Sequence, residues 1–472
     1  MILLYLITPA LIMFFISFSH HIYLRRILPI TNLMVLIPTL YLFSLGKPYA
    51  IIGEYLVATN LNSYILLISS IVAIGVTLAL ITLNKHVKID NRSYIKFYRF
   101  FALFWIGLIL SIMSNNMGIY WIGLEMATLS TVYMIKTNKS KQASKEAWNY
   151  MIVGAIAISL ILFGIILIYA SAKPILGEEA MNFALLKEHI HEIKNPFLFE
   201  LGFVIVSVGM FIKMGFFPMN LWLANIERAS FYPVGALFSG ILESAILIGF
   251  FQFSMIAMQI DKEATFSFVF IYLFLTISLV SFLIFRSKDF MRLFSLSGVE
   301  HMVLIILFWV SGGYFPALLH FGAHAFLKPA LFLSTGVLES QGRYKIAGAL
   351  KGYHGFEGKT FWFIVGFFIL AIVSLPPSPM FFSEIYGFSA MITLAKETDS
   401  LLWMILAITI LLLILSIIFY KFIEIYQSMK YEEEEVEKIV YKSELLAFLL
   451  FTVATIGLIM PQTITYLKAI HG

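Results

Sequence analysis

The chain is built from long apolar runs separated by short polar breaks. A helix needs about 20 mostly apolar residues to cross a bilayer, and the 472-residue chain contains many runs of this kind. Only 12% of its residues are charged, against about 25% in a typical soluble domain. We therefore predict an integral membrane protein. The fourteen predicted spans are residues 1–19, 27–45, 61–83, 97–114, 117–135, 148–171, 198–218, 234–258, 266–285, 294–310, 315–338, 361–395, 402–421 and 444–460.

The predicted fold class is an all-α polytopic bundle. The apolar runs are too long for the strands of a membrane barrel, and they lack strand alternation. The first run is interpreted as span 1 and not as a signal peptide, because Arg25 and Arg26 follow its apolar stretch instead of preceding it. Most Lys and Arg residues lie in the breaks after odd-numbered spans. The positive-inside rule then places these breaks in the cytoplasm and both termini on the outer side of the cell membrane.

Apart from Arg99 and Lys421 at the ends of their spans, only two of the 32 basic residues lie inside predicted spans, Lys213 and Lys328. A lysine at the centre of a membrane helix costs about 2.5–3.5 kcal/mol on insertion scales, so it usually faces a polar interior. Snorkelling to an interface is the alternative, but both lysines lie far from the ends of their spans. The carboxylates expected at membrane depth are those of Glu125, Glu243, Glu300, which precedes His301, and Glu384.

His320, His324 and Lys328 are spaced four residues apart in "LLHFGAHAFLKPALFL". This spacing puts all three on one stripe of a helix. Metal or haem binding is the alternative interpretation. However, Lys328 would repel a metal ion, the chain has no cysteine, and haem ligation across a bundle usually takes histidines from two helices. We therefore predict a polar relay, and neither a metal nor a cofactor in this chain.

Proline interrupts two predicted spans next to a charged residue. Lys213 precedes the break in "IKMGFFPMNLW" of span 7, and Glu384 follows the break in "SLPPSPMFFSE" of span 12. Proline frees a backbone carbonyl, which membrane proteins tolerate only inside protein or beside a hydrated cavity. A pair of interrupted helices indicates inverted repeats. The predicted domains are spans 1–3 (1–96), a five-helix repeat of spans 4–8 (97–258), a second one of spans 9–13 (259–421), and an acidic cytoplasmic linker with span 14 (422–472).

Several of these segments resemble one known family. "PMNLWLANIERASFYPVGALFSG", "KDFMRLFSLSGVEHM", the stripe and "PPSPMFFSE" resemble the antiporter-like subunits of respiratory complex I, multisubunit sodium/proton antiporters and membrane-bound hydrogenases. Glu125 matches the family's glutamate in span 5, Lys213 its lysine in broken span 7, and Glu384 its charged position in broken span 12. The form "SGVEHM" and the glutamate in span 12 look most like the hydrogenase and formate hydrogenlyase branch.

The chain also departs from the pattern of this family at three positions. Asn149 stands where many relatives have a lysine in span 6, and Asn220 stands where they have a histidine before the tryptophan. The lysine of span 8 is replaced by Ser244, with Glu243 one residue earlier and so about 100° round the helix. These changes put the completeness of the first repeat's ion path in question.

The resemblance implies translocation of H⁺ or Na⁺ by coupled titration. The implied path uses Glu125, Lys213, His320, His324, Lys328 and Glu384, with Glu243, Glu300 and His301 as additional candidates. A direct Glu125–Lys213 pair about 4 Å apart would contribute about 4 kcal/mol at an effective dielectric constant of 20. Opening this pair would make the lysine release its proton, which could pass through water or the stripe towards Glu384.

The resemblance also implies the partners. The chain itself would do no redox chemistry, and iron–sulfur clusters and other redox centres would lie in partner subunits, which comprise other membrane subunits and a peripheral redox arm. It would then be the non-redox membrane subunit of an oxidoreductase-linked translocase, in contact with the lipid bilayer; nucleic acid is not implied. Two alternatives stay open: a subunit of a stand-alone multisubunit sodium/proton antiporter, and a scaffold with a degraded ion path.

Overall fold

The computed structural model describes residues 2–18, 24–87, 89–288, 290–340, 356–398, 400–428 and 441–470. The chain divides into two compact units. The first comprises Met1–Ala73, Ile89–Ser230 and Ile241–Ile271, and the second comprises Ile74–Lys88, Phe231–Gly240 and Tyr272–Gly472. Most of the acidic run at 431–442, predicted to be a solvated cytoplasmic segment, lies outside the described residues.

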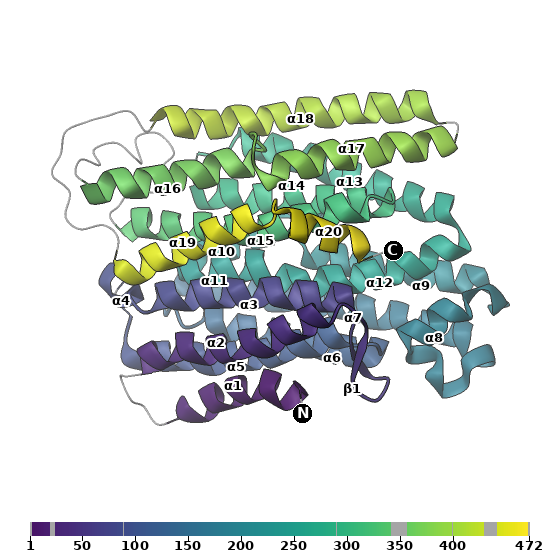
Figure 1. The fold of residues 1–472 in the computed structure, drawn as a ribbon, viewed down its shortest axis with the longest axis horizontal. Helices are drawn as coiled ribbons and strands as arrows, with labels where there is room; N and C mark the ends of the chain where they lie inside the picture. Colours follow the sequence, from purple (N-terminus) through teal and green to yellow (C-terminus); the bar gives the residue numbers. More distant parts are fainter. Residues whose placement is uncertain are drawn as a thin grey trace. The chain divides into compact units, whose positions relative to one another are not determined.

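Helices make up most of the first unit (Figure 1). Its elements are α1 (Ile2–Ile16), α2 (Leu24–Leu45), β1 (Tyr49–Ile52), β2 (Leu56–Ala58), α3 (Asn60–Leu80), α5 (Asn91–Met113), α6 (Met117–Ile135), α7 (Lys141–Leu176), η1 (Gly177–Met181), α8 (Phe183–Glu188), η2 (Ile190–Glu192), α9 (Pro196–Lys213), α10 (Leu221–Ala229), α12 (Glu243–Ile260) and α13 (Lys262–Phe285). Helices α3 and α13 begin in this unit and end in the second one.

The second unit is helical in its described residues. Its elements are α4 (Leu83–His86), α11 (Tyr232–Leu237), the π-helical turn η3 (Phe238–Leu242), α14 (Phe290–Val310), α15 (Tyr314–Ser340), α16 (Phe356–Ile372), α17 (Pro379–Glu397), α18 (Leu401–Ser428), α19 (Lys442–Gly457) and α20 (Pro461–Ala469). Within this unit α15 packs against α14, α16 and α17, and α17 packs against α18. Figure 1 shows α16 and α17 one after the other along a common line, with α18 running alongside them.

The β1–β2 hairpin corrects the predicted all-α class. The two strands pair antiparallel, with Tyr49 opposite Ala58. Gly53 lies in the turn with a φ of +50°, a left-handed conformation that glycine adopts without steric cost. The flanking Tyr, Ile, Leu and Val residues favour strands. The segment is too short to span a membrane, so the protein is mostly helical rather than all-α.

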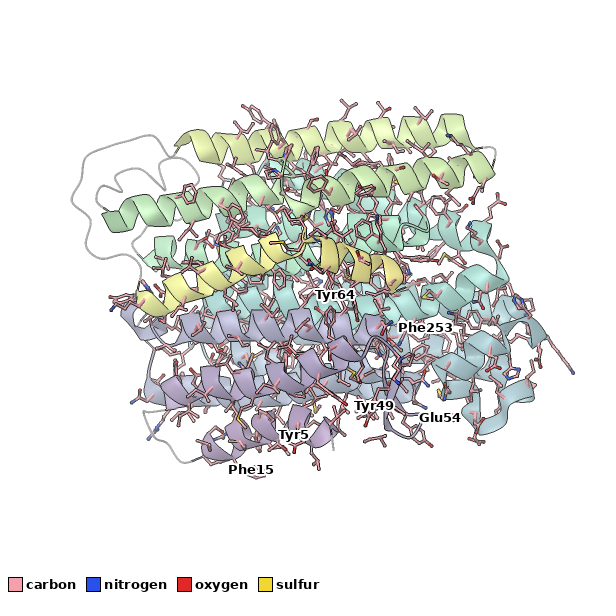
Figure 2. The ribbon with its side chains drawn as sticks, in the orientation of Figure 1. Tyr5, Phe15, Tyr49, Glu54, Tyr64 and Phe253 are labelled. Carbon is pink, nitrogen blue, oxygen red and sulfur yellow. The ribbon has the colours of Figure 1, made fainter. Side chains whose placement is uncertain are left out.

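Eight helical segments among the described residues are long and apolar enough to cross a membrane, or nine if the bent pair α19 and α20 is one span. The apolar helices Ile2–Ile16, Ile30–Leu45 and Phe363–Ile372 are shorter than this criterion requires. Many large apolar side chains point outward, as Tyr5 and Phe15 of α1 do with 64% and 67% exposure (Figure 2). A helical protein with such an apolar surface suits a lipid environment better than water. The number of fourteen spans stays a prediction.

Glycines allow α7 and α9 to pack with their backbones in contact. A Cβ atom on Gly164 would lie 2.6 Å from the carbonyl oxygen of Gly202, and one on Gly209 would lie 2.7 Å from that of Ala157. Small residues that permit such close approach are typical of membrane helix pairs, which gain little from the hydrophobic effect. This packing holds α9, whose last residue is Lys213, against α7.

Two helix ends carry candidate residues. Helix α9 ends at Lys213, and the indole of Trp222 donates a hydrogen bond of 3.0 Å to the carbonyl of Ile212, which satisfies one acceptor at this end. Helix α16 ends at Ile372, and α17 begins at Pro379. Ser378 caps α17, because its side chain accepts a 3.2 Å hydrogen bond from the amide of Phe381. Glu384 therefore lies in the second turn of α17.

Candidate functional site

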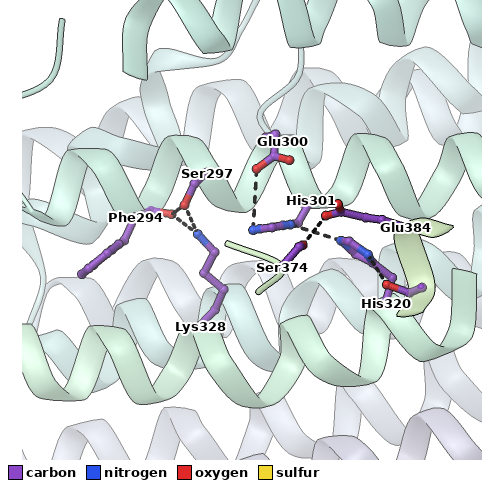
Figure 3. Close-up of polar contacts among 9 residues, drawn as sticks. Phe294, Ser297, Glu300, His301, His320, Lys328, Ser374 and Glu384 are labelled. Atoms are coloured by element: carbon purple, nitrogen blue, oxygen red, sulfur yellow. Dashed lines mark hydrogen bonds and ion pairs between the residues drawn. The ribbon is translucent and has the colours of Figure 1, made fainter. Parts of the chain in front are cut away.

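A row of buried polar side chains runs between α14, α15 and α17 in the second unit (Figure 3). Helix α14 contributes Glu300 and His301, and helix α15 contributes the predicted stripe. The side chains are buried: the exposed fractions are 1% for Glu300, 4% for His301, 0% for His320, 1% for His324 and 0% for Lys328. Buried ionisable groups in an apolar bundle are costly and usually functional.

Lys328 forms one end of this row. Its ammonium group donates a hydrogen bond of 2.6 Å to the carbonyl oxygen of Phe294 and a second one to the hydroxyl of Ser297. Gly298 follows directly, and a Cβ atom at this position would lie 3.9 Å from Nε2 of His324 and from Nζ of Lys328. Two neutral oxygen atoms therefore accept hydrogen bonds from the lysine, and Gly298 has no side chain to separate Lys328 from His324.

The histidines contact one another across the two helices. Nδ1 of His301 lies 3.1 Å from Nε2 of His320, and the ring of His301 is centred 5.7 Å from that of His324. Nδ1 of His320 lies 2.8 Å from the hydroxyl oxygen of Ser383 on α17. Imidazoles at these distances can exchange protons, because each ring has one nitrogen that donates and one that accepts.

Glu300 and Glu384 line one cavity. Oε2 of Glu300 lies 3.6 Å from Nε2 of His301, and neither carboxylate oxygen has a hydrogen-bond partner among the described residues. The cavity has a volume of about 210 Å³ and is lined by Glu300, His301, Ser374, Glu384 and side chains of α18. At about 30 Å³ per molecule, several waters would fit there. Water can therefore connect α14 with Glu384.

The carboxylate of Glu384 is bonded to a serine that has an unusual backbone conformation. The hydroxyl of Ser374, in the break between α16 and α17, donates a hydrogen bond to its carboxylate. Ser374 has a φ of +60°, a region that residues other than glycine seldom adopt. Such conformations persist only where surrounding contacts enforce them, and they concentrate at functional sites.

In the first unit, Lys213 bonds to a hydroxyl and not to Glu125. Its ammonium group donates to Oγ1 of Thr128, and no ion pair joins it to Glu125 in the described part of the chain. This differs from the direct pair that we expected. The reason is that Thr128 lies one turn after Glu125 on the same face of α6, so its hydroxyl meets the lysine first. Glu125 instead borders an apolar cavity of about 370 Å³ together with Phe100, Trp121 and Tyr133.

The positions that depart from the family pattern are also buried or bonded. Asn149 donates a 3.1 Å hydrogen bond to Glu146, and Gln142 donates a 3.0 Å hydrogen bond to the other oxygen of that carboxylate. Glu146 is 4% exposed. Glu243 begins α12 with 5% exposure, and the neighbouring Ser244 is fully buried. The first unit thus has buried carboxylates close in sequence to Asn149 and Ser244.

Sequence reasoning missed Thr128, Glu146, Ser297, Ser374 and Ser383. Hydroxyl residues are common in membrane helices, and nothing in the spacing of the threonine and the three serines marks them as functional. A signal existed only for Glu146, which stands near the start of the predicted span 148–171. Among the described residues no group of three or more His, Asp or Glu side chains could hold a metal ion.

Residues 114–416 match the model of one protein family, described as NADH:quinone oxidoreductase/Mrp antiporter, TM. The chain belongs to this family. It is a multi-pass membrane protein related to subunits of complex I, Mrp antiporters and hydrogenases, as the resemblance indicated. The match begins before α6 and ends in α18, and so covers every residue of the row.

Individual proteins similar to this chain fit this assignment. The chain is 30% identical over 349 residues to the hydrogenase-4 component F homolog of Methylacidiphilum infernorum, which is 70% of this chain and 71% of that protein. Its fold is similar to a chain of the membrane-bound sulfane sulfur reductase, an archaeal respiratory membrane complex, with a TM-score of 0.86 at 19% identity over 100% and 96% of the two chains. A chain of the Mrp complex from a Dietzia species gives a TM-score of 0.84 at 13% identity over 99% and 96%.

Proposed function

We propose that this chain is the H⁺- or Na⁺-translocating membrane subunit of a complex I-related, redox-driven pump of the membrane-bound hydrogenase type. The observation that carries the proposal is the buried row in the second unit, where Lys328, three histidines and Glu300 lead to a cavity shared with Glu384. A purely structural core seldom buries so many titratable groups, because removing each charged form from water costs free energy. The identity to a hydrogenase-4 component F homolog supports the type of complex.

In this proposal each unit contributes one set of titrating groups. The first unit has Glu125, Lys213 and Glu243, and the second has the row and Glu384. The redox centres and the peripheral arm belong to partner subunits, and the chain itself carries no cofactor. Its place is the cell membrane, with fourteen spans, two inverted five-helix repeats at 97–258 and 259–421 with broken spans 7 and 12, and both termini outside.

One observation favours a second function, a scaffold that keeps the fold but conducts poorly. Ser244 and Asn149 replace lysines, and the amide of Asn149 is engaged with Glu146. A subunit of a stand-alone antiporter shares the same family. Purification of the intact assembly distinguishes two of these functions. Hydrogenase subunits in the assembly would identify the redox-driven pump, and small antiporter subunits alone would identify the stand-alone antiporter.

The proposal is tested by ion uptake into vesicles that contain the intact assembly. We expect electron transfer to drive uptake in the native complex and Glu384→Gln to reduce it about a hundredfold, because a positioned proton-transfer group contributes about 10²- to 10⁴-fold. Glu397→Gln on the same helix is the matched control, since Glu397 is exposed. Uptake that survives Glu384→Gln in an assembled complex would contradict the proposed role of the cavity.

The orientation is tested by cysteine labelling in intact cells. A cysteine at Lys139 should react only from the cytoplasmic side, and cysteines at Lys187 and Lys262 only from outside. Lys139 is exposed and pairs with Asp90 at 2.9 Å, so this position is accessible to a labelling reagent. Hydrogen bonds from Ser93 and Lys139 lower the pKa of Asp90 to about 2. The chain has no native cysteine, so no background reaction arises within this chain. Labelling of position 139 from outside would reverse the predicted topology.

A further inference from the structure

Ser383 closes the histidine row at its α17 end. Its side chain is fully buried, and its hydroxyl oxygen lies between Nδ1 of His320 at 2.8 Å and the carbonyl oxygen of Met380 at 2.7 Å. Neither the family pattern nor the spacing of charged residues singles out this serine. The two contacts together determine where the protons of the row lie.

The carbonyl of Met380 sets the direction of the first hydrogen bond. A carbonyl oxygen only accepts, and a serine hydroxyl has a single proton to donate. The proton of Ser383 must therefore point to Met380, because two oxygen lone pairs at 2.7 Å would otherwise repel each other. The lone pair of Ser383 then faces His320, so Nδ1 of His320 carries a proton and donates it to the serine.

This direction propagates along the row. With its proton on Nδ1, a neutral His320 presents the lone pair of Nε2 to His301, whose Nδ1 at 3.1 Å must donate. A neutral His301 then presents the lone pair of its own Nε2 to Oε2 of Glu300, 3.6 Å away. The row can receive a proton from Glu300, and neither carboxylate oxygen of Glu300 has a hydrogen-bond partner in the described structure.

We propose that Ser383 is a positioning residue that fixes the tautomer of His320. As a result, His320 is the last residue of the row that can accept a proton. The inference rests on the proposed function. A proton leaves Oε2 of Glu300 for Nε2 of His301, while the Nδ1 proton of His301 moves to Nε2 of His320. The products are a negatively charged Glu300 carboxylate and a positively charged, doubly protonated His320, so the number of protons and the net charge of the row are unchanged.

The proton does not continue beyond His320 in this arrangement. Ser383 has its own proton engaged with the Met380 carbonyl, which is no proton carrier. His320 therefore holds the proton and returns it to Glu300, and exchange with Glu384 runs through the cavity that Glu300, His301 and Glu384 share. Besides these groups, His324 and Lys328 on α15 are the titratable residues along the row.

The test combines transport with a direct measurement of the tautomer. We expect Ser383→Ala and the nearly isosteric Ser383→Cys to lower ion uptake by the assembled complex about fivefold, the effect of losing one orienting hydrogen bond. Ser383→Thr keeps a hydroxyl and should restore most of it. Ser389→Ala on the same helix is the control, because Ser389 is exposed. In a His320→Asn background, Ser383→Ala should add nothing, since it acts through His320.

Nitrogen NMR of ¹⁵N-histidine-labelled complex, compared with His320→Asn, reports the tautomer without any transport. We expect His320 to carry its proton on Nδ1 in the native complex and to populate both tautomers in Ser383→Ala. A native His320 with its proton on Nε2 overturns the inference, as does equal uptake in Ser383→Ala and the native complex. Absence of uptake in the native complex together with the Nδ1 tautomer would instead contradict the proposed function.

Discussion

Arginine at position 328 is expected to reduce ion uptake as severely as methionine, about a hundredfold, which is within the range for a positioned proton-transfer group. Lys328 donates hydrogen bonds to the Phe294 carbonyl and to the hydroxyl of Ser297, which are neutral acceptors. An arginine keeps the positive charge but stays protonated above about pH 12. Lys328→Met removes the titrating group altogether.

A structural lysine would give a different pattern. If a fixed positive charge sufficed to hold α14 against α15, Lys328→Arg would restore what Lys328→Met loses. Uptake by vesicles with each assembled variant, measured beside the rate of electron transfer, distinguishes the two patterns. Lys396→Arg provides the control, because Lys396 is an exposed lysine in the last turn of α17. Full uptake in Lys328→Arg would show that the row only stabilises the second unit.

Local signals in the sequence were sufficient to predict many helices. Helix α6 covers Met117–Ile135, the same residues as the predicted span. Asn116 marks its start, because its side chain accepts hydrogen bonds of 2.9 and 3.1 Å from the amides of Gly118 and Ile119. Polar residues follow its last turn at Lys136. Ends of this kind depend on neighbours in the sequence, and so they can be predicted without tertiary structure.

The contacts of the row could not be predicted in the same way. The spacing of four placed His320, His324 and Lys328 on one stripe, where Cβ atoms of successive members are about 6 Å apart. In the structure, His320 and Lys328 reach across to α14 instead, to His301 and to Phe294 and Ser297. These partners depend on how α14 and α15 are rotated against each other, which no single-helix pattern specifies.

The break in span 12 illustrates the same limit. The prolines at 376, 377 and 379 predicted an interruption near Glu384. They did not indicate that Ser374 would adopt a φ of +60° and donate to Glu384. Proline restricts its own φ and the residue before it, whereas the direction of the serine side chain depends on the packing of α17 on α16.

Removal of the lysine in the first unit is expected to have the second large effect. Lys213→Ala should reduce ion uptake about a hundredfold, again within the range for a positioned proton-transfer group. Lys213 is 4% exposed at the end of α9 and donates to Thr128 on α6, one turn from Glu125. A change of side-chain rotamer that moves the ammonium group from Thr128 to Glu125 would exchange a neutral acceptor for a carboxylate. Such a change alters how strongly the lysine holds its proton, because an opposite charge nearby favours the charged form.

Thr128→Val separates this role from a structural one. Valine preserves the shape of threonine but removes the hydroxyl that accepts a hydrogen bond from Lys213. The ammonium group of Lys213 would then move to Glu125 and remain there, so ion uptake should fall severalfold while the complex still assembles. A lysine that only caps the end of α9 would respond differently: Lys213→Ala would destabilise the assembly, visible on native gels, and the assembled fraction would retain its uptake per complex. Normal uptake in fully assembled Lys213→Ala would therefore exclude the lysine from the ion path. The carboxylates of Glu125 and Glu243 would then be the remaining titrating candidates of the first unit, and a scaffold role for this unit would be favoured.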